Sequence, residues 1–138
     1  MSEGHYKIRR LVISYVIIII FILIVIITFL SLLPWQALGL LSISGMDKIY
    51  HVAAFSCLAF PLPLVRPRLI KWVLLGVIVF GGFIELIQQF FGREASLLDF
   101  IANGIGAIIG VTFARLIGFW AFGSDNFNIA NNEPIKDD

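Results

Sequence analysis

The chain has 138 residues, 59% of them hydrophobic, and a formal net charge of only +1. Soluble domains are about 45–50% apolar, so this composition excludes an ordinary soluble protein and indicates one that is solvated by a lipid bilayer. The near-neutral charge provides no basic patch for nucleic acid, and the single cysteine, Cys57, excludes an internal disulfide.

The first apolar run, residues 11–33, contains no charged residue and is long enough to cross a bilayer as a helix. A cleaved signal peptide would have a shorter apolar region followed by small residues at a cleavage site. This run ends instead in Leu33, Pro34 and Trp35, and a tryptophan at that point suits the membrane interface. We therefore expect an uncleaved spanning helix after a short N-terminal segment, 1–10.

Three further apolar runs follow, at residues 47–65, 72–91 and 97–122. The second run contains Pro61 and Pro63, which predict a kink because proline lacks a backbone N–H. The polar segment 123–138 is rich in Asn and Asp and is predicted to be a disordered tail. No internal repeat or second domain is apparent, so residues 11–122 form one predicted transmembrane domain.

The distribution of basic residues predicts the orientation of these helices. Of the ten lysines and arginines, all except Lys48 and Arg93 fall on one side if the N-terminus is cytoplasmic. Cytoplasmic loops of membrane proteins carry such an excess of basic residues. The sequence therefore predicts an all-α protein: an antiparallel four-helix transmembrane bundle with both termini in the cytoplasm.

This topology brings polar residues from three helices and one loop to the outer end of the bundle. Asp47 and His51 are spaced i, i+4, and so are Asp99 and Asn103, so each pair lies on one face of its helix. The candidate ligand-binding residues are Asp47, Lys48, His51, Glu85, Gln88, Arg93, Asp99 and Asn103. On the fourth helix, small residues repeat at i+4 steps and include Gly106 and Gly110, which are predicted to let helix backbones approach closely.

Glu85 is the most informative of these residues. It lies about six residues, or roughly 9 Å, inside the predicted helix end, where a carboxylate is costly and usually functional. A structural role remains open, in which Glu85 bonds Arg93 or His51 to fix the packing. Asp47 can equally be a helix N-cap, and Ser96 to Asp99 matches a capping box.

The candidate ligand-binding residues limit the reactions and cofactors that the site could support. They include no nucleophile motif, P-loop or nucleotide fingerprint. His51, Glu85 and Asp99 have side chains that bind divalent metals, but their spacing matches no closed metal motif. We therefore expect neither a metal nor a cofactor.

Asp47-Lys48-x-x-His51, Glu85-x-x-Gln88, Arg93 and Asp99-x-x-x-Asn103-x-x-Gly106 together resemble the VanZ-like family of bacterial membrane proteins. The resemblance extends from about Met46 to Gly110. The family is named for a protein linked to low-level resistance to teicoplanin, a glycopeptide antibiotic with a lipid tail. The resemblance implies a multi-pass protein of the bacterial plasma membrane, with a role in the cell envelope and a shared site at the outer face. The resemblance does not identify a catalysed reaction.

Three functions follow as hypotheses. The first is a binding protein for the headgroup of an envelope lipid or glycopeptide. The second is a membrane enzyme that acts on a lipid-linked substrate, with Glu85 and His51 as acid and base. The third is a structural accessory of an envelope complex, in which the polar residues only lock the helices together. The expected partners are the bilayer and such a headgroup, with a homo-oligomer or a membrane partner left open and no nucleic acid expected.

Overall fold

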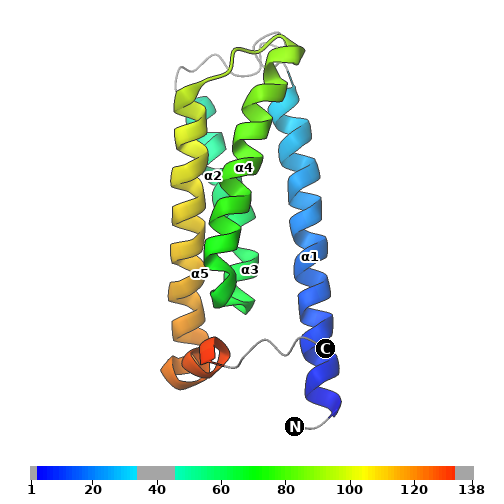
Figure 1. Ribbon diagram of the computed structural model, residues 1–138, viewed down its shortest axis with the longest axis vertical. Coiled ribbons are helices and arrows are strands. Elements are labelled where there is room, and N and C mark those ends of the chain that lie inside the picture. The colour runs from blue at the N-terminus through cyan, green and yellow to red at the C-terminus, as the bar shows by residue number, and fades with distance from the viewer. Residues whose placement is uncertain (1–2, 34–45, 133–138) are drawn as a thin grey trace.

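The computed structural model describes residues 3–33 and 46–132, and it places side chains for residues 7–33 and 46–121. All the regular secondary structure in this part of the chain is helical. Its elements are α1 (Glu3–Leu32), α2 (Met46–Ala59), α3 (Pro61–Val65), the 3-10 turn η1 (Pro67–Leu69), α4 (Ile70–Gln88), the 3-10 turn η2 (Gln89–Phe91) and α5 (Leu97–Asn132) (Figure 1).

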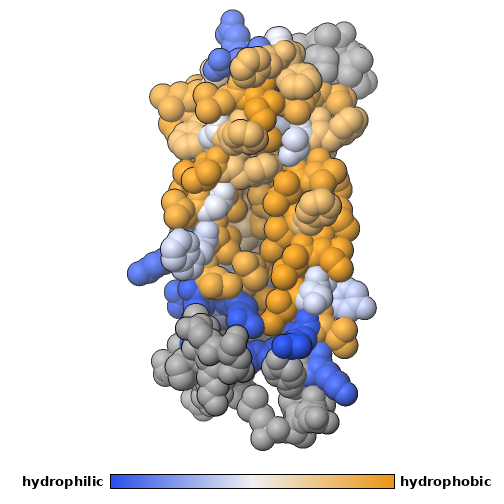
Figure 2. Space-filling model, turned by 45° about the vertical axis from the view of Figure 1, so that its right-hand side comes forward, coloured by the Kyte–Doolittle hydropathy of each residue, from blue (hydrophilic) through white to orange (hydrophobic). Residues whose placement is uncertain are grey.

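Four helical segments are long and apolar enough to cross a membrane, as the sequence predicted. They are Lys7–Leu32, Met46–Val65, Pro67–Phe91 and Leu97–Ala121. Figure 2 shows the corresponding surface, an apolar band between hydrophilic residues that gather at the ends of the molecule. The four spans indicate a multi-pass membrane protein.

The two prolines interrupt the second span. Helix α2 ends at Ala59, and α3 begins at Pro61 after the bend at Phe60. Pro61 occupies the first turn of α3, where its missing N–H is not required. The second span is therefore two short helices, which agrees with the kink that Pro61 and Pro63 predict.

The last helix is longer than the apolar run. The sequence predicted a disordered tail from residue 123, but α5 continues to Asn132. Asn and Asp disfavour a helix interior without preventing one, so a long apolar helix can extend through them. Residues 133–138 lie outside the described part of the chain.

Helices α2 and α5 form the closest helix pair, because glycines remove the side chains between them. A Cβ atom on Gly106 would lie 2.5 Å from the carbonyl oxygen of Val52. A Cβ atom on Gly110 would overlap the carbonyl oxygen of Ser56. The Ser56 hydroxyl donates a hydrogen bond of 2.9 Å to the carbonyl oxygen of Gly106. This contact fixes the register in which α2 and α5 present their polar residues.

An apolar core lies below the polar end of the bundle. Phe55 of α2 is fully buried and packs against Phe80 of α4, with ring centroids 5.9 Å apart. Ile27 of α1 and Ala107 and Val111 of α5 belong to the same buried cluster. Most other large side chains of α1 are exposed, as expected for a helix that faces lipid.

Candidate functional site

The polar residues meet at the end of the bundle drawn at the top of Figure 1. The first turns of α2 and α5, the last turns of α1 and α4, and the connection between α4 and α5 come together there. We call Asp47, Lys48, His51, Glu85, Arg93, Asp99 and Asn103 the polar cluster. Within it, His51, Glu85, Asp99 and Asn103 are buried, and the other three are partly exposed.

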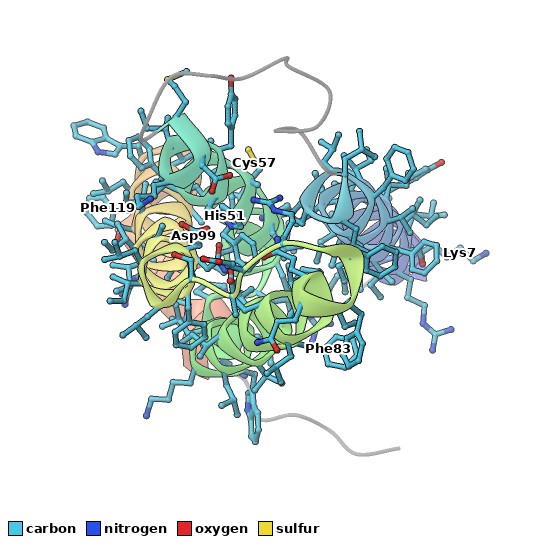
Figure 3. All side chains as sticks on the ribbon, turned by 90° about the horizontal axis from the view of Figure 1, so that it is seen from above. Lys7, His51, Cys57, Phe83, Asp99 and Phe119 are labelled. Carbon is cyan, nitrogen blue, oxygen red and sulfur yellow. The ribbon has the colours of Figure 1, made fainter. Side chains whose placement is uncertain are left out.

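His51 and Asn103 form the centre of the polar cluster. The Nδ1 atom of His51 lies 2.8 Å from Oδ1 of Asn103. An amide oxygen only accepts, so His51 donates through Nδ1–H, and in the neutral imidazole the lone pair is then on Nε2. That Nε2 atom lies 3.9 Å from Oδ2 of Asp99, which is too long for a hydrogen bond. Figure 3, a view onto this end, shows His51 and Asp99 pointing toward one another between α2, α4 and α5.

Two cationic side chains border this centre. The Lys48 ammonium lies 3.7 Å from Oδ1 of Asp99, and its side chain is 44% exposed. The Arg93 guanidinium donates to Oδ1 of Asp47 at 3.2 Å and to the carbonyl oxygen of Ser31 at 2.8 Å. Arg93 therefore ties the start of α2 to the end of α1, and it pairs with Asp47 rather than with Glu85.

Glu85, rather than Asp99, accepts the backbone N–H of Ser96 at the start of α5. Ser96 caps α5 by accepting a hydrogen bond from the N–H of Asp99 through its hydroxyl, at 3.2 Å. In a capping box the Asp99 carboxylate would accept the N–H of Ser96 in return. Oε2 of Glu85 accepts that N–H instead, at 3.1 Å. The carboxylate of Asp99 is thus left to face Lys48 and His51.

Other polar residues at this end of the bundle have different positions or roles. Gln88 is buried but donates to the carbonyl oxygen of Ser31, so it fastens α4 to α1. Asp47 lies in the first turn of α2, which begins at Met46. The polar side chains of Gln89 and Glu94 are exposed, and the structure leaves them outside the polar cluster.

Several buried polar atoms of the polar cluster have no hydrogen-bond partner among the described residues. They are Oε1 of Glu85, Oδ1 of Asp99 and Nδ2 of Asn103. Each such atom costs about 1–3 kcal/mol when it is left unsatisfied away from water. Two acceptors and one donor are therefore available to a bound molecule.

Ser31, Ser56 and Ser96 complete the site, and the sequence analysis did not single out the first two. Ser31 contributes a backbone carbonyl oxygen, which has no sequence signature. Ser56 lies on the face of α2 that meets Gly106, so the i+4 spacing from Val52 was the available signal. No family model matches the chain, and no curated protein or solved structure matches it either.

Proposed function

We propose that the chain is an antiparallel four-helix protein of the bacterial plasma membrane and that its polar cluster binds a headgroup at the outer surface. The observation that carries this proposal is the set of buried atoms on Glu85, Asp99 and Asn103 that have no hydrogen-bond partner among the described residues. Polar groups at the end of a membrane bundle are retained against their desolvation cost when a ligand uses them.

The orientation rests on the basic residues. Arg66 lies between the second and third spans, Arg68 and Lys71 lie at the start of the third span, and Lys7 lies at the start of the first. The positive-inside rule places this end in the cytoplasm, together with both termini. The polar cluster then faces the outside of the cell.

The polar cluster favours a headgroup that carries both an anionic and a donor group. Oε1 of Glu85 and Oδ1 of Asp99 have no hydrogen-bond donor among the described residues and would accept from an ammonium or from sugar hydroxyls. Lys48 is partly exposed and can reach a phosphate oxygen. A zwitterionic lipid headgroup carries both kinds of group, and the VanZ-like resemblance supports glycopeptide resistance as the cellular role.

Susceptibility to teicoplanin in a sensitive host tests this role. The host would express wild type, Asp99→Asn or Glu94→Gln, and membrane abundance would be measured for each. Glu94 is the matched control because it is an exposed carboxylate at the same end of the bundle. We expect protection by wild type and by Glu94→Gln, and its loss in an equally abundant Asp99→Asn. Equal protection by all three proteins would overturn the proposal, and a collapse in abundance would support a structural role for the polar cluster.

One observation favours the enzyme hypothesis as the second candidate. The Nε2 atom of His51 keeps its lone pair beside the Asp99 carboxylate, while Asn103 orients the ring. A histidine that is oriented in this way can act as a general base, whereas one oxygen of the Glu85 carboxylate already accepts the N–H of Ser96. Turnover of a lipid-linked substrate by purified wild type, lost in His51→Gln, would favour this candidate over simple binding.

A further inference from the structure

A group of potential metal ligands lies within the polar cluster. Asp47, His51 and Asp99 each offer one ligand atom, and these three atoms lie within 4.8 Å of one another. Asp47 and His51 come from successive turns of α2, and Asp99 comes from the first turn of α5. The sequence predicted no metal site because the third ligand belongs to a distant helix and completes no spacing motif.

The hydrogen bond to Asn103 prepares His51 as a ligand. Because Oδ1 of Asn103 accepts the Nδ1–H, the lone pair of the imidazole is on Nε2, which faces Asp99. Histidines that bind metals usually donate their other N–H to an oxygen in this way, which fixes both the tautomer and the ring orientation. His51 is also buried, so water does not compete freely for Nε2.

Asp99 provides an independent indication of a missing partner. It is 4% exposed, and its Oδ1 atom has no hydrogen-bond partner among the residues that the structure describes, because the Lys48 ammonium is 3.7 Å away, beyond hydrogen-bond distance. Its Oδ2 atom lies 3.9 Å from Nε2 of His51, so two groups with lone pairs face each other across a gap. A cation between them would satisfy both.

The distances are compatible with a small transition-metal ion. Bonds from Zn²⁺ to nitrogen and oxygen of about 2.1 Å in a tetrahedral site separate two ligand atoms by roughly 3.4 Å. The separation of 3.9 Å between His51 and Asp99 therefore has to shorten only slightly. Asp47 has a side chain that is 46% exposed, so it can rotate to close the third position.

The balance of charges in the polar cluster also favours a bound cation. Asp47, Glu85 and Asp99 carry three carboxylates, and Lys48 and Arg93 carry the only two permanent positive charges of the polar cluster. Lys48 lies 3.7 Å from Asp99 and is the side chain that an ion would displace. Because Lys48 is partly exposed, it can turn outward at little cost.

We infer that Asp47, His51 and Asp99 form a binding site for one divalent transition-metal ion of the Zn²⁺ type, with an open coordination position toward the membrane surface. A mixed imidazole and carboxylate donor set suits Zn²⁺ better than Mg²⁺, which prefers oxygen ligands alone. The open position would accept a phosphate oxygen, and this last role rests on the proposed headgroup function. Binding of the ion itself does not depend on the headgroup function.

A Zn²⁺ titration of the full-length chain tests the site. The protein would be purified in detergent without a histidine tag, stripped with a chelator and titrated with Zn²⁺ against a chromophoric chelator. We expect one ion per chain in wild type and about 100-fold weaker binding in His51→Ala. His5→Ala is the matched control, since His5 is the other of the two histidines, and it should bind as wild type does.

A second variant separates loss of ligand from loss of fold. Lys48→Met removes the cation that competes for Asp99, so it should bind Zn²⁺ more tightly than wild type, by about tenfold. A destabilised protein would not show such a gain. Equal Zn²⁺ affinity in wild type, His51→Ala and Lys48→Met would overturn the inference.

The result also separates this inference from the proposed function. If the chelator-stripped protein still binds a headgroup, while Zn²⁺ binds wild type no more tightly than His51→Ala, the metal site is refuted and headgroup binding stands. If Zn²⁺ binds as expected and no headgroup binds, the metal site stands alone.

Discussion

Gly106→Ala should disrupt the contact that holds the two halves of the polar cluster together. The added Cβ atom would lie 2.5 Å from the carbonyl oxygen of Val52 and 3.1 Å from Cβ of Phe55. Ordinary contact begins at 3.4 Å, so α2 and α5 would have to separate by about 0.9 Å. Neither obstacle is the flexible end of a side chain, so rotation of a side chain cannot relieve the overlap.

The magnitude follows from that separation. A gap of about 0.5–1 Å forfeits a quarter to a half of each dispersion contact across an interface. The Ser56 hydroxyl would also move from 2.9 Å to roughly 3.8 Å from the carbonyl oxygen of Gly106, beyond hydrogen-bond distance. Overpacking of this kind costs about 1–3 kcal/mol, and we expect the upper end, about 3 kcal/mol, which is roughly a hundredfold in the folded-to-unfolded ratio.

Gly104→Ala is the matched control in the same helix. No atom lies within 4 Å of the position that its Cβ would take. Because alanine is the better helix former, Gly104→Ala should be neutral or stabilising, by up to about 1 kcal/mol. Unfolding in detergent, followed by helical circular dichroism, measures both variants. Equal stability of Gly106→Ala and Gly104→Ala would refute the close packing of α2 on α5.

Two further changes test the connections at the polar end. Glu85→Gln keeps an oxygen acceptor for the N–H of Ser96, whereas Glu85→Ala removes it, so Glu85→Ala should cost about 0.5–2 kcal/mol more stability in the same unfolding assay. Equal losses in the two variants would show that the carboxylate does not cap α5. In Arg93→Lys a single, less extended ammonium nitrogen replaces the two guanidinium nitrogens that bond Ser31 and Asp47, so it should lose one of these bonds and cost about 1 kcal/mol. A thermal unfolding curve identical to wild type would contradict that bridge.

The spans could be predicted from the sequence because membrane insertion imposes a strong constraint on composition. Four uncharged or nearly uncharged runs correspond to the four spans, and Pro61 marked the break in the second. The end of α5 was less predictable. Hydropathy marks where an apolar run stops, whereas a helix ends only where its backbone hydrogen bonds do.

The convergence of His51, Asp99 and Asn103 could be inferred from alternating helix directions and i+4 spacing, but their individual bonds could not. A capping box is recognised from local sequence, and it paired Ser96 with Asp99. The structure gives half of that pairing to Glu85, which is distant in sequence. Likewise, Arg93 meets Asp47 and a backbone carbonyl because of the way the helix ends meet, and no spacing rule encodes that contact.

Binding of a short-chain phosphatidylethanolamine to the purified protein tests the central claim most directly. Its ammonium and phosphate are the groups that the polar cluster is proposed to hold, and a titration would compare wild type, Asp99→Asn and Glu94→Gln. Loss of a charge-assisted hydrogen bond worth about 1.5–3 kcal/mol predicts roughly 10–100-fold weaker binding in Asp99→Asn, with Glu94→Gln unchanged. Saturable binding of equal strength in all three proteins, or none in wild type, would contradict the account.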